Sequence, residues 1–408
     1  MNSTSVLSRS LQSPVPAQRQ SLVDALRGFA LFGILVVNLV AFASPYYGLG
    51  IPDPNAQSPA GQAAALLIAG LFETKFYLLF SFLFGYSFTL QMESAQRAGA
   101  SFVPRILRRL LGLWVIGLLH ALFLYHGDIL TTYAVLGLVL LLLRRQPDAR
   151  LCRWALWLIL ATALLWAGIG VLANADPMTI STADAPARAA AALAAYRGTA
   201  ATVVAQHLYE FTQVWAVLGL MQAPTALAMF LLGLVAGKRR LLAQVSPQRR
   251  LFRRLLLAGV VIGLPGAALY AWTSVKLMGV PEIFGLSLSL LTAPFLTAGY
   301  VGGMMLWFDT RRGRMLADLL APAGRMALSN YVLQSLICAL IFFAYGWRLM
   351  GQVGPLAGLG LAGLIFVAQL ACSRWWLHHF SYGPLEWLLR GFTNLRLSPL
   401  QRRQTPGH

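Results

Sequence analysis

Charged side chains are scarce in this chain of 408 residues and make up only 11% of it. A soluble domain carries roughly 25% charged residues, because its surface must be wetted by water. Hydrophobic residues make up 58% of the chain, so it has too few polar side chains to cover itself as a soluble globule. The composition excludes an ordinary water-soluble domain and indicates an integral membrane protein.

Cysteine and histidine are also few, and their spacing argues against two kinds of site. The three cysteines, Cys152, Cys338 and Cys372, form no CxxC pair, so neither a disulfide framework nor a zinc site is predicted. None of the six histidines has the i, i+4 spacing of a helical metal-binding pair. We therefore expect no bound metal and no built-in cofactor.

Acidic residues number 13 against 32 Lys and Arg, which gives a net charge of +19. In a soluble protein this excess would suggest binding to nucleic acid. Here the basic residues are dispersed over several loops between apolar runs, where anionic lipid headgroups attract them. We expect a lipid bilayer with anionic lipids as the partner, and no nucleic acid.

Long apolar runs dominate the chain. All but the short fourth run approach the ~17–25 residues that a helix needs to cross the hydrocarbon layer. The runs lie near residues 28–44, 76–92, 106–125, 129–143, 151–173, 211–236, 255–275, 285–307, 326–346 and 355–372. We predict an all-α, polytopic membrane helix bundle of about ten transmembrane helices.

Basic residues fall in every second connection between these runs, whereas the intervening connections hold only Arg188, Arg197, Lys276 and Arg348. Short loops rich in Lys and Arg stay on the cytoplasmic side of the membrane. The alternation predicts that both termini are cytoplasmic.

The chain is predicted to divide at its most basic internal segment. The expected parts are a disordered tail at 1–20, a six-helix membrane part at 21–237, a basic cytoplasmic linker at 238–254, a four-helix part with an interfacial tail helix at 255–395, and a polar tail at 396–408. Residues 61–72 could extend the second span or form a separate interfacial helix. The Ala-rich external stretch 174–205 is expected to form a surface helix over the bundle.

Polar side chains within the apolar runs are costly in lipid and indicate either function or tight packing. Asp24 and Arg27 share a face at the cytoplasmic end of the first helix and can pair. Asn38 lies eleven residues further on, about 16 Å along the helix. Glu73 and Lys75, at the external edge of the second span, cannot face each other on a helix, so each needs another partner. Membrane anchoring by Arg27 and helix packing by Asn38 remain as alternatives.

His120 is the strongest candidate for a general base. The third and fourth spans form a tight hairpin, so His120 and Tyr133 are expected at similar depth and within reach of each other. Asp128, in the turn, can orient the histidine or cap the fourth helix. A buried imidazole titrates near neutrality and can accept a proton.

The ninth span opens with polar residues. Asn330 and Gln334 share a face, and Arg325 lies at the cytoplasmic end. Amides in this position can bind a substrate or hold neighbouring helices together, and both alternatives stay open.

Several segments resemble the YeiB-like family of bacterial inner-membrane proteins. They are Leu26-Arg27-Gly28-Phe29-Ala30 with Asn38, Lys75-Phe76 with Leu79 to Gly85, Gly117-Leu118-Leu119-His120 with Gly127-Asp128-Ile129-Leu130 and Tyr133-Ala134, Gly324 to Tyr331 with Gln334-Ser335, and Tyr382-Gly383-Pro384-Leu385-Glu386-Trp387. The resemblance implies a multi-pass protein of the bacterial inner membrane with a C-terminal domain of unknown function. It implies no settled activity.

More remotely, Asp24-Ala25-Leu26-Arg27-Gly28 resembles the Leu-Asp-x-x-Arg-Gly entry of transmembrane acyltransferases. Such enzymes pass an acyl group from a cytoplasmic acyl-CoA to an acceptor at or beyond the outer face. The chain lacks the two-histidine or loop-histidine pattern of those enzymes, which puts the transfer of their catalytic residues in doubt. The resemblance implies acyl-CoA as a co-substrate, with Arg27, Arg108 and Arg109 near its phosphates.

The hypothesis that follows is an acyltransferase-like enzyme acting on a small molecule or a lipid. The predicted catalytic residues are His120, Asp128 and Tyr133. The predicted substrate- or donor-binding residues are Arg27, Asn38, Glu73, Lys75, Arg108, Arg109, Arg325, Asn330 and Gln334, with Asn38 and Asn330 as oxyanion donors. A transporter lined by Glu73, Lys75, Asp128 and Arg27, and a structural protein in which all these groups join helices, remain as alternatives.

Overall fold

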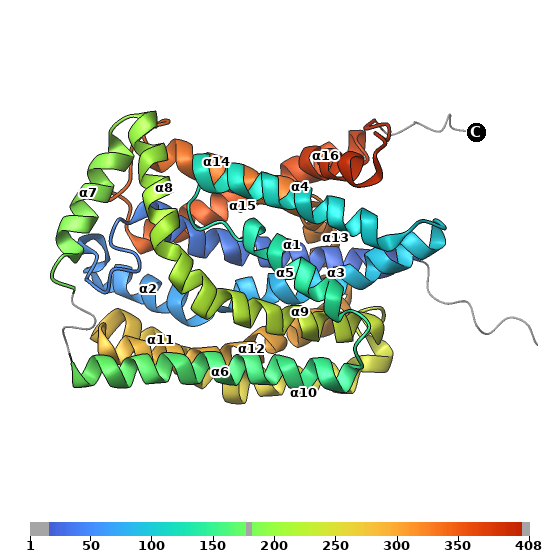
Figure 1. Ribbon diagram of the computed structural model, residues 1–408, viewed down its shortest axis with the longest axis horizontal. Coiled ribbons are helices and arrows are strands. Elements are labelled where there is room, and N and C mark those ends of the chain that lie inside the picture. The colour runs from blue at the N-terminus through green and yellow to red at the C-terminus, as the bar shows by residue number, and fades with distance from the viewer. Residues whose placement is uncertain (1–15, 177–181, 402–408) are drawn as a thin grey trace, which may run out of the picture.

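The computed structural model describes residues 16–176 and 182–401, and every regular element in these ranges is a helix. Most helices run along the long axis of the molecule (Figure 1). The first half contains α1 (Pro16–Ala43), α2 (Pro59–Leu71), α3 (Lys75–Arg97), α4 (Phe102–Phe123), α5 (Leu130–Leu143), α6 (Asp148–Ala175), α7 (Ala185–Arg197) and α8 (Ala200–Val217). The second half contains α9 (Ala223–Lys238), α10 (Arg249–Ala258), α11 (Leu264–Trp272), α12 (Val280–Phe308), α13 (Arg311–Arg325), α14 (Ala327–Phe342), α15 (Pro355–His379) and α16 (Pro384–Asn394).

Eight helical stretches of the described chain are long and apolar enough to cross a membrane, or nine if the bent pair α13 and α14 counts as one. The sequence had suggested about ten, a number that also counts the short apolar helix α5. The short run became α5, which has only 14 residues. The run at 326–346 became α14, which follows α13 after a bend of 78°.

Apolar side chains face outward along the helices, as expected for contact with lipid. On α4 and α6, Leu119, Trp157 and Leu164 expose 54%, 65% and 71% of their surface. Water would oppose such exposure on several adjacent helices, whereas lipid tails do not. The chain is a multi-pass membrane protein.

Several segment boundaries differ from those expected. α1 begins at Pro16, within the stretch expected to be a disordered tail. The basic linker is helical in its second half, because α10 begins at Arg249. α2 and α3 are separated by a turn at Thr74, which has a φ of 64°, but together they form one apolar stretch of 39 residues. Within the external stretch 174–205, α7 and the start of α8 are described, and residues 177–181 lie outside the described residues. Residues 1–15 and 402–408 of the two predicted tails also lie outside them.

Small residues allow the closest helix crossings. A Cβ added at Gly28 of α1 would lie 2.3 Å from the Leu320 carbonyl oxygen of α13. A Cβ at Gly85 of α3 would lie 2.1 Å from the Phe230 carbonyl oxygen of α9. Helices in lipid associate mainly by such close packing. The first contact fixes α13, and hence the start of α14, against α1, and the second fixes α9 against α3.

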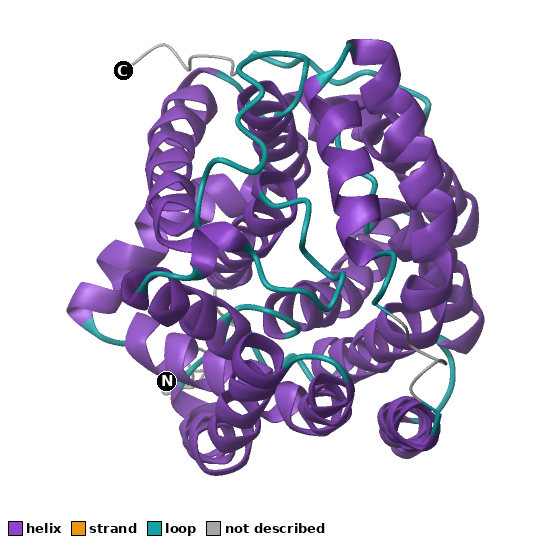
Figure 2. Cartoon of the chain, turned by 90° about the vertical axis from the view of Figure 1, so that its left-hand side faces the viewer, coloured by secondary structure: helices purple, strands orange, loops and turns teal. Residues whose placement is uncertain are grey.

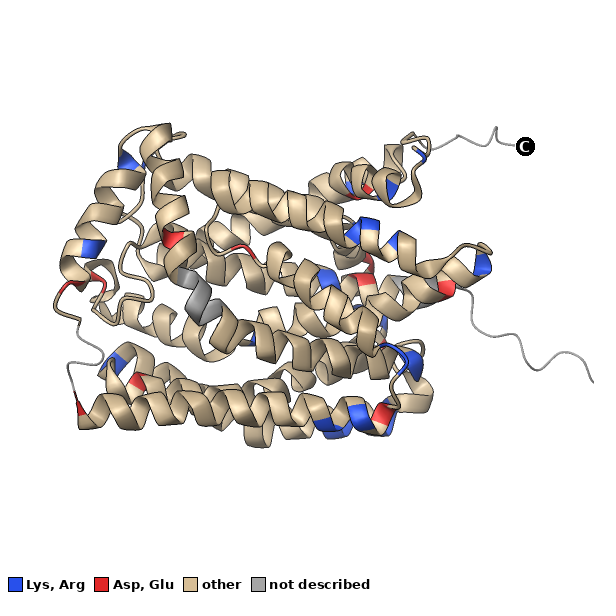
Figure 3. Cartoon of the chain, viewed as in Figure 1, with Lys and Arg blue, Asp and Glu red and all other residues tan. Residues whose placement is uncertain are grey.

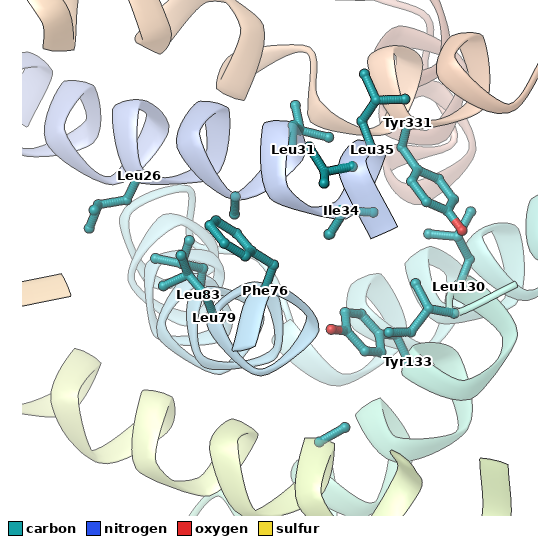
Figure 4. Packing of buried hydrophobic residues seen from close by; sticks show 14 of the residues in the cluster. Leu26, Leu31, Ile34, Leu35, Phe76, Leu79, Leu83, Leu130, Tyr133 and Tyr331 are labelled. Atoms are coloured by element: carbon teal, nitrogen blue, oxygen red, sulfur yellow. The ribbon is translucent and has the colours of Figure 1, made fainter. Parts of the chain in front are cut away.

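Lys and Arg gather at one end of the bundle, opposite the end that carries α7 and α8 (Figure 3). Seen from the α7–α8 end, the connecting loops cross between the ends of the helices (Figure 2). Below these loops, apolar side chains from α1, α3, α5 and α14 form a continuous core, drawn in Figure 4. We call the two ends the basic end and the α7–α8 end.

Candidate functional site

Three buried side chains from two distant parts of the chain lie in series. His120 is hydrogen-bonded to Ser335 and lies at ion-pair distance from Asp128, but neither Nδ1 of His120 nor Oδ1 of Asp128 has a hydrogen-bond partner among the described residues. Nδ1 of His120 lies 2.9 Å from Oδ1 of Asp128. Nε2 of the same ring lies 2.8 Å from Oγ of Ser335. All three residues are at most 2% exposed. A serine, a histidine and an aspartate are therefore joined in series, in the order found in hydrolytic and acyl-transfer triads.

The protons in this series have a preferred arrangement. An ionised carboxylate can only accept, so the tautomer with its proton on Nδ1 suits the side of His120 that faces Asp128, and it leaves Nε2 free to accept from the Ser335 hydroxyl. We assign this tautomer from the partners of the two ring nitrogens. It is the arrangement in which an imidazole can take a proton from a hydroxyl.

Local structure holds the carboxylate in place. Asp128 lies just before α5, and its Oδ2 accepts the Thr131 backbone N–H at 2.8 Å. Gly117, one turn before His120 on α4, leaves room for it, because a Cβ there would lie 2.8 Å from the same oxygen. The Tyr331 ring packs on the His120 ring with 4.8 Å between centroids. Asp128 thus caps the start of α5 and also contacts His120, so the two alternatives for this residue, helix cap and partner of the histidine, occur together.

Tyr133 does not take part in this series, although the hairpin geometry had suggested that it would reach His120. Its hydroxyl lies 2.7 Å from Oγ of Ser81 and donates to the Tyr77 carbonyl at 3.0 Å. Figure 4 shows the Tyr133 hydroxyl turned toward α3 and the Tyr331 hydroxyl turned toward Leu130. The cause is the direction in which the side chain leaves its helix: Tyr133 projects from α5 toward α3.

A second carboxylate–imidazole pair lies nearer the α7–α8 end. Oε2 of Glu210 lies 2.8 Å from Nδ1 of His126 and accepts the Tyr196 hydroxyl at 2.6 Å. Burial raises the pKa of Glu210, but the hydrogen bond and charge of His126 outweigh it and lower the pKa to about 2. For His207, which lies beside this pair, burial disfavours the charged imidazolium and lowers the pKa to about 4. These residues tie α7 and α8 to the loop after α4.

At the basic end, several arginines surround few acids. Arg27 contacts Asp24 and donates to Oγ of Ser87 at 2.5 Å. Arg109 lies close enough to Arg27 for their charges to interact, and Arg325 approaches Asp24 in the same way. Arg27 and Arg325 therefore lie around the Asp24 carboxylate, and Arg109 lies near Arg27 and near the carboxylate of Glu386.

Arg108 has another role in the structure. Its Nε donates to the Thr393 carbonyl at 2.9 Å and helps dock α16 on α4. Glu386 of α16 accepts the Leu328 and Ser329 backbone N–H groups at 2.7 and 3.1 Å. It therefore caps α14, the helix that carries Ser335. Burial raises the pKa of the Glu386 carboxyl, although the hydrogen bonds from Ser329 and Leu328 oppose this.

Asn330 and Gln334 belong to a network of neutral groups between α14 and α15. Nδ2 of Asn330 donates to Oγ of Ser373 at 2.9 Å, and Nε2 of Gln334 donates to Oε1 of Gln369 at 2.7 Å. Gln369 in turn donates to the Asn330 carbonyl at 3.0 Å. This geometry favours the helix-joining alternative for both amides, and the Asn330 amide is already engaged.

Glu73 and Lys75 share a partner. The Tyr270 hydroxyl of α11 donates to Oε2 of Glu73 at 2.9 Å, and Nζ of Lys75 lies 5.2 Å from the centre of the same ring. The fully buried ammonium also donates to the Ala69 carbonyl at 3.0 Å. Each charge therefore has another partner, as their spacing required. Asn38 is part-exposed, and no side-chain hydrogen bond is found for it within the described residues.

One cavity lies away from His120. It has a volume of about 540 Å³ and lies among α6, α11 and α12, where Asn174, Leu269, Thr273 and Phe284 line it. Within residues 16–176 and 182–401, no group of His, Cys, Asp and Glu has the geometry of a metal site.

Two of the residues described above were not among the predicted site residues. Ser335 lay in a polar stretch of the ninth span, and its hydroxyl is one turn from Tyr331 on the same helix face. Glu210 adjoins a long apolar run, which is unusual for an acid. Both signals were visible, but the sequence did not show which residues they would contact.

Residues 236–396 match the family described as "Protein of unknown function (DUF418)". The chain is 33% identical over 411 residues to "Uncharacterized protein YxaH" of Bacillus subtilis (strain 168). That alignment covers 97% of this chain and 99% of the relative. It is 29% identical over 402 residues to "Uncharacterized protein YeiB" of Escherichia coli (strain K12), in an alignment that covers 92% of this chain and 96% of the relative. The membrane bundle and this nearly full-length similarity agree with the motifs in the sequence, and the chain belongs to the YeiB-like family.

Proposed function

We propose that the protein is an acyl-transfer enzyme of the bacterial inner membrane, with both termini in the cytoplasm. The observation that carries the proposal is the Asp128–His120–Ser335 series, in which one nitrogen of a buried imidazole lies 2.9 Å from a carboxylate and the other lies 2.8 Å from a hydroxyl. A histidine held in this way is suited to take a proton from a hydroxyl that attacks an acyl group.

The placement of charge supports an acyl-CoA as donor. Arg109 and His120 are eleven residues apart on α4, which places them on nearly the same face and about 16 Å apart along the axis. Guanidinium groups bind phosphates well, and Arg27, Arg109 and Arg325 lie together at the basic end. A carrier bound there by its phosphates would extend its pantetheine arm along α4 toward His120.

The acceptor reaches the site from the lipid. His120 and Ser335 are flanked in sequence by Leu119 and Leu336, which expose 54% and 41% of their surface on the outer faces of α4 and α14. The two helices meet here through side chains, so a small separation of α4 from α14 opens the buried groups to the membrane. The acceptor is a hydroxyl on a lipid or on an amphiphile dissolved in the bilayer.

The test is transfer by the full-length protein in lipid nanodiscs. Acetyl-CoA and palmitoyl-CoA, each labelled in the acyl group, are supplied from the basic end, and the bilayer contains total bacterial lipid. We expect a labelled lipid product, and we expect His120→Gln to reduce its formation by about 10³-fold or more. His126→Gln is the matched control, because that histidine also pairs with a carboxylate but faces no serine.

Two outcomes would contradict the proposal. One is equal turnover in the His120→Gln protein with unchanged thermal unfolding. The other is movement of an unmodified solute across proteoliposomes with no labelled product, which would indicate a transporter.

A further inference from the structure

We infer that Ser335 is a covalent acyl carrier, so that transfer proceeds in two steps through an acyl-serine. This inference rests on the proposed function and adds a nucleophile to it. A general base alone needs only room for an acceptor hydroxyl beside His120. The structure fills that place with a hydroxyl of the protein itself, 2.8 Å from Nε2.

The position of Ser335 differs from that of the serines that serve packing. Ser81 donates to the Tyr77 carbonyl four residues earlier at 2.7 Å, which satisfies its hydroxyl within its own helix. For Ser335 the corresponding distance to the Tyr331 carbonyl is 3.4 Å, so the short contact is the one to His120. The hydroxyl is directed at a base rather than back at its own helix.

The same helix also carries a buried hydroxyl without a partner in the described part of the chain. Tyr331 lies one turn before Ser335, its ring packs on His120, and its hydroxyl is buried with no hydrogen-bond partner among the described residues. A buried donor without a partner is unfavourable. The hydroxyl is turned toward Leu130 (Figure 4), so it must rotate toward Ser335 before it can stabilise an oxyanion there.

The proposed chemistry needs no reactant beyond donor and acceptor. Oγ of Ser335 attacks the thioester carbonyl, the Oγ–C bond forms and the C–S bond breaks, and the proton passes through His120 to the leaving sulfur. The acceptor hydroxyl then gives its proton to His120 and attacks the acyl-serine. The new ester bond forms, the Oγ–C bond breaks, and His120 returns the proton to Oγ.

The experiment traps the first step. The full-length protein, in nanodiscs of a lipid without hydroxyl groups, is mixed with labelled acetyl-CoA or palmitoyl-CoA, digested, and analysed by mass spectrometry. We expect one acyl group on the peptide that contains Ser335. Ser335→Ala should abolish the mark and lower transfer to hydroxyl-bearing lipid by about 10³-fold, whereas Ser373→Ala, in the same bundle, should retain both.

Ser335→Cys distinguishes chemistry from packing. It keeps a nucleophile of similar size and should be acylated as a thioester, which neutral hydroxylamine cleaves, whereas the wild-type ester resists it. Its labelling also shows that the substituted site is folded. Transfer at the wild-type rate by Ser335→Ala would overturn the acyl-serine and leave the proposed function standing. Absence of transfer by the wild type with both donors would overturn the proposed function and the acyl-serine together.

Discussion

Two buried polar networks share helix α14 and differ in kind. One joins Asn330 and Gln334 to α15 through amide and hydroxyl groups, all of them neutral. The other joins Ser335, the residue next to Gln334, to His120 and thus to a carboxylate. The side chains of both networks are equally shielded from solvent, because all of them are buried.

The difference teaches that burial alone does not identify a functional group in a membrane protein. In the neutral network the amide nitrogens pair with another amide or with a neighbouring carbonyl or hydroxyl, and these bonds hold α14 to α15. In the other network a proton can move between partners. A buried acid and imidazole are costly to maintain, and replacing them with apolar groups would be a simpler way to join helices. The two networks should therefore respond differently to mutation.

The largest expected effect follows from Asp128→Asn. The amide would donate to Nδ1 of His120 and leave the proton on the other nitrogen, so the imidazole could no longer accept from Ser335. We expect acyl transfer to fall by about 10⁴-fold. The labelled-product assay in nanodiscs measures this, and thermal unfolding in detergent serves as the control for folding. A loss of less than tenfold would place Asp128 with the packing groups.

Glu210→Gln tests the other carboxylate–imidazole pair, which contains no serine. The pKa of Glu210 is lowered from 4.5 to about 2, so its charged form stabilises the fold above pH 4.5, and this contribution is lost as the pH falls toward 2. We expect the variant to lose at most on the order of 3 kcal/mol of stability at pH 7 and less at pH 4. Thermal unfolding at the two pH values measures this.

Acyl transfer by folded Glu210→Gln protein should stay within about threefold of wild type, because the residue holds α7 and α8 to the loop after α4 rather than the reacting groups. A large loss of transfer at unchanged stability would show that the two pairs act as one system.

A smaller effect is expected from Gln369→Leu in the neutral network. The substitution leaves Nε2 of Gln334 without its acceptor in a buried position. We expect a loss of about 2 kcal/mol in the free energy of unfolding, from the unsatisfied donor and the lost contact between α14 and α15. Transfer, assayed below the unfolding temperature, should be nearly unchanged. If transfer fell more than stability, the amides would belong to the site.

The all-α membrane class of the protein and the positions of its helices could be predicted from the sequence, because both depend on local composition. Apolar runs such as 355–372 are long enough to read directly, and the predicted runs became helices. The number of spans could not be predicted as well, since it depended on the length of α5 and on the bend of 78° between α13 and α14. Such a bend is set by tertiary contacts, including the capping of α14 by Glu386 from another part of the chain.

The site was predictable only in part, for a similar reason. His120 and Asp128 are eight residues apart around a tight turn, so their proximity follows from local structure. Ser335 is 215 residues from His120 in the sequence, and only the packed bundle brings them together. Rotation about a helix axis is the other unknown: similar depth was expected for Tyr133 and His120, yet Tyr133 projects toward α3.

Tyr133→Phe should have the smallest effect and tests that rotation. The substitution removes one hydroxyl, which contacts Oγ of Ser81 and donates to the Tyr77 carbonyl. Ser81 keeps its own bond to that carbonyl, so no buried group is left without a partner, and a loss of about 1 kcal/mol is expected from unfolding measurements. Acyl transfer should stay within about twofold of wild type. A loss comparable to that of Asp128→Asn would mean that Tyr133 turns toward His120 during transfer, and that α5 rotates when substrate binds.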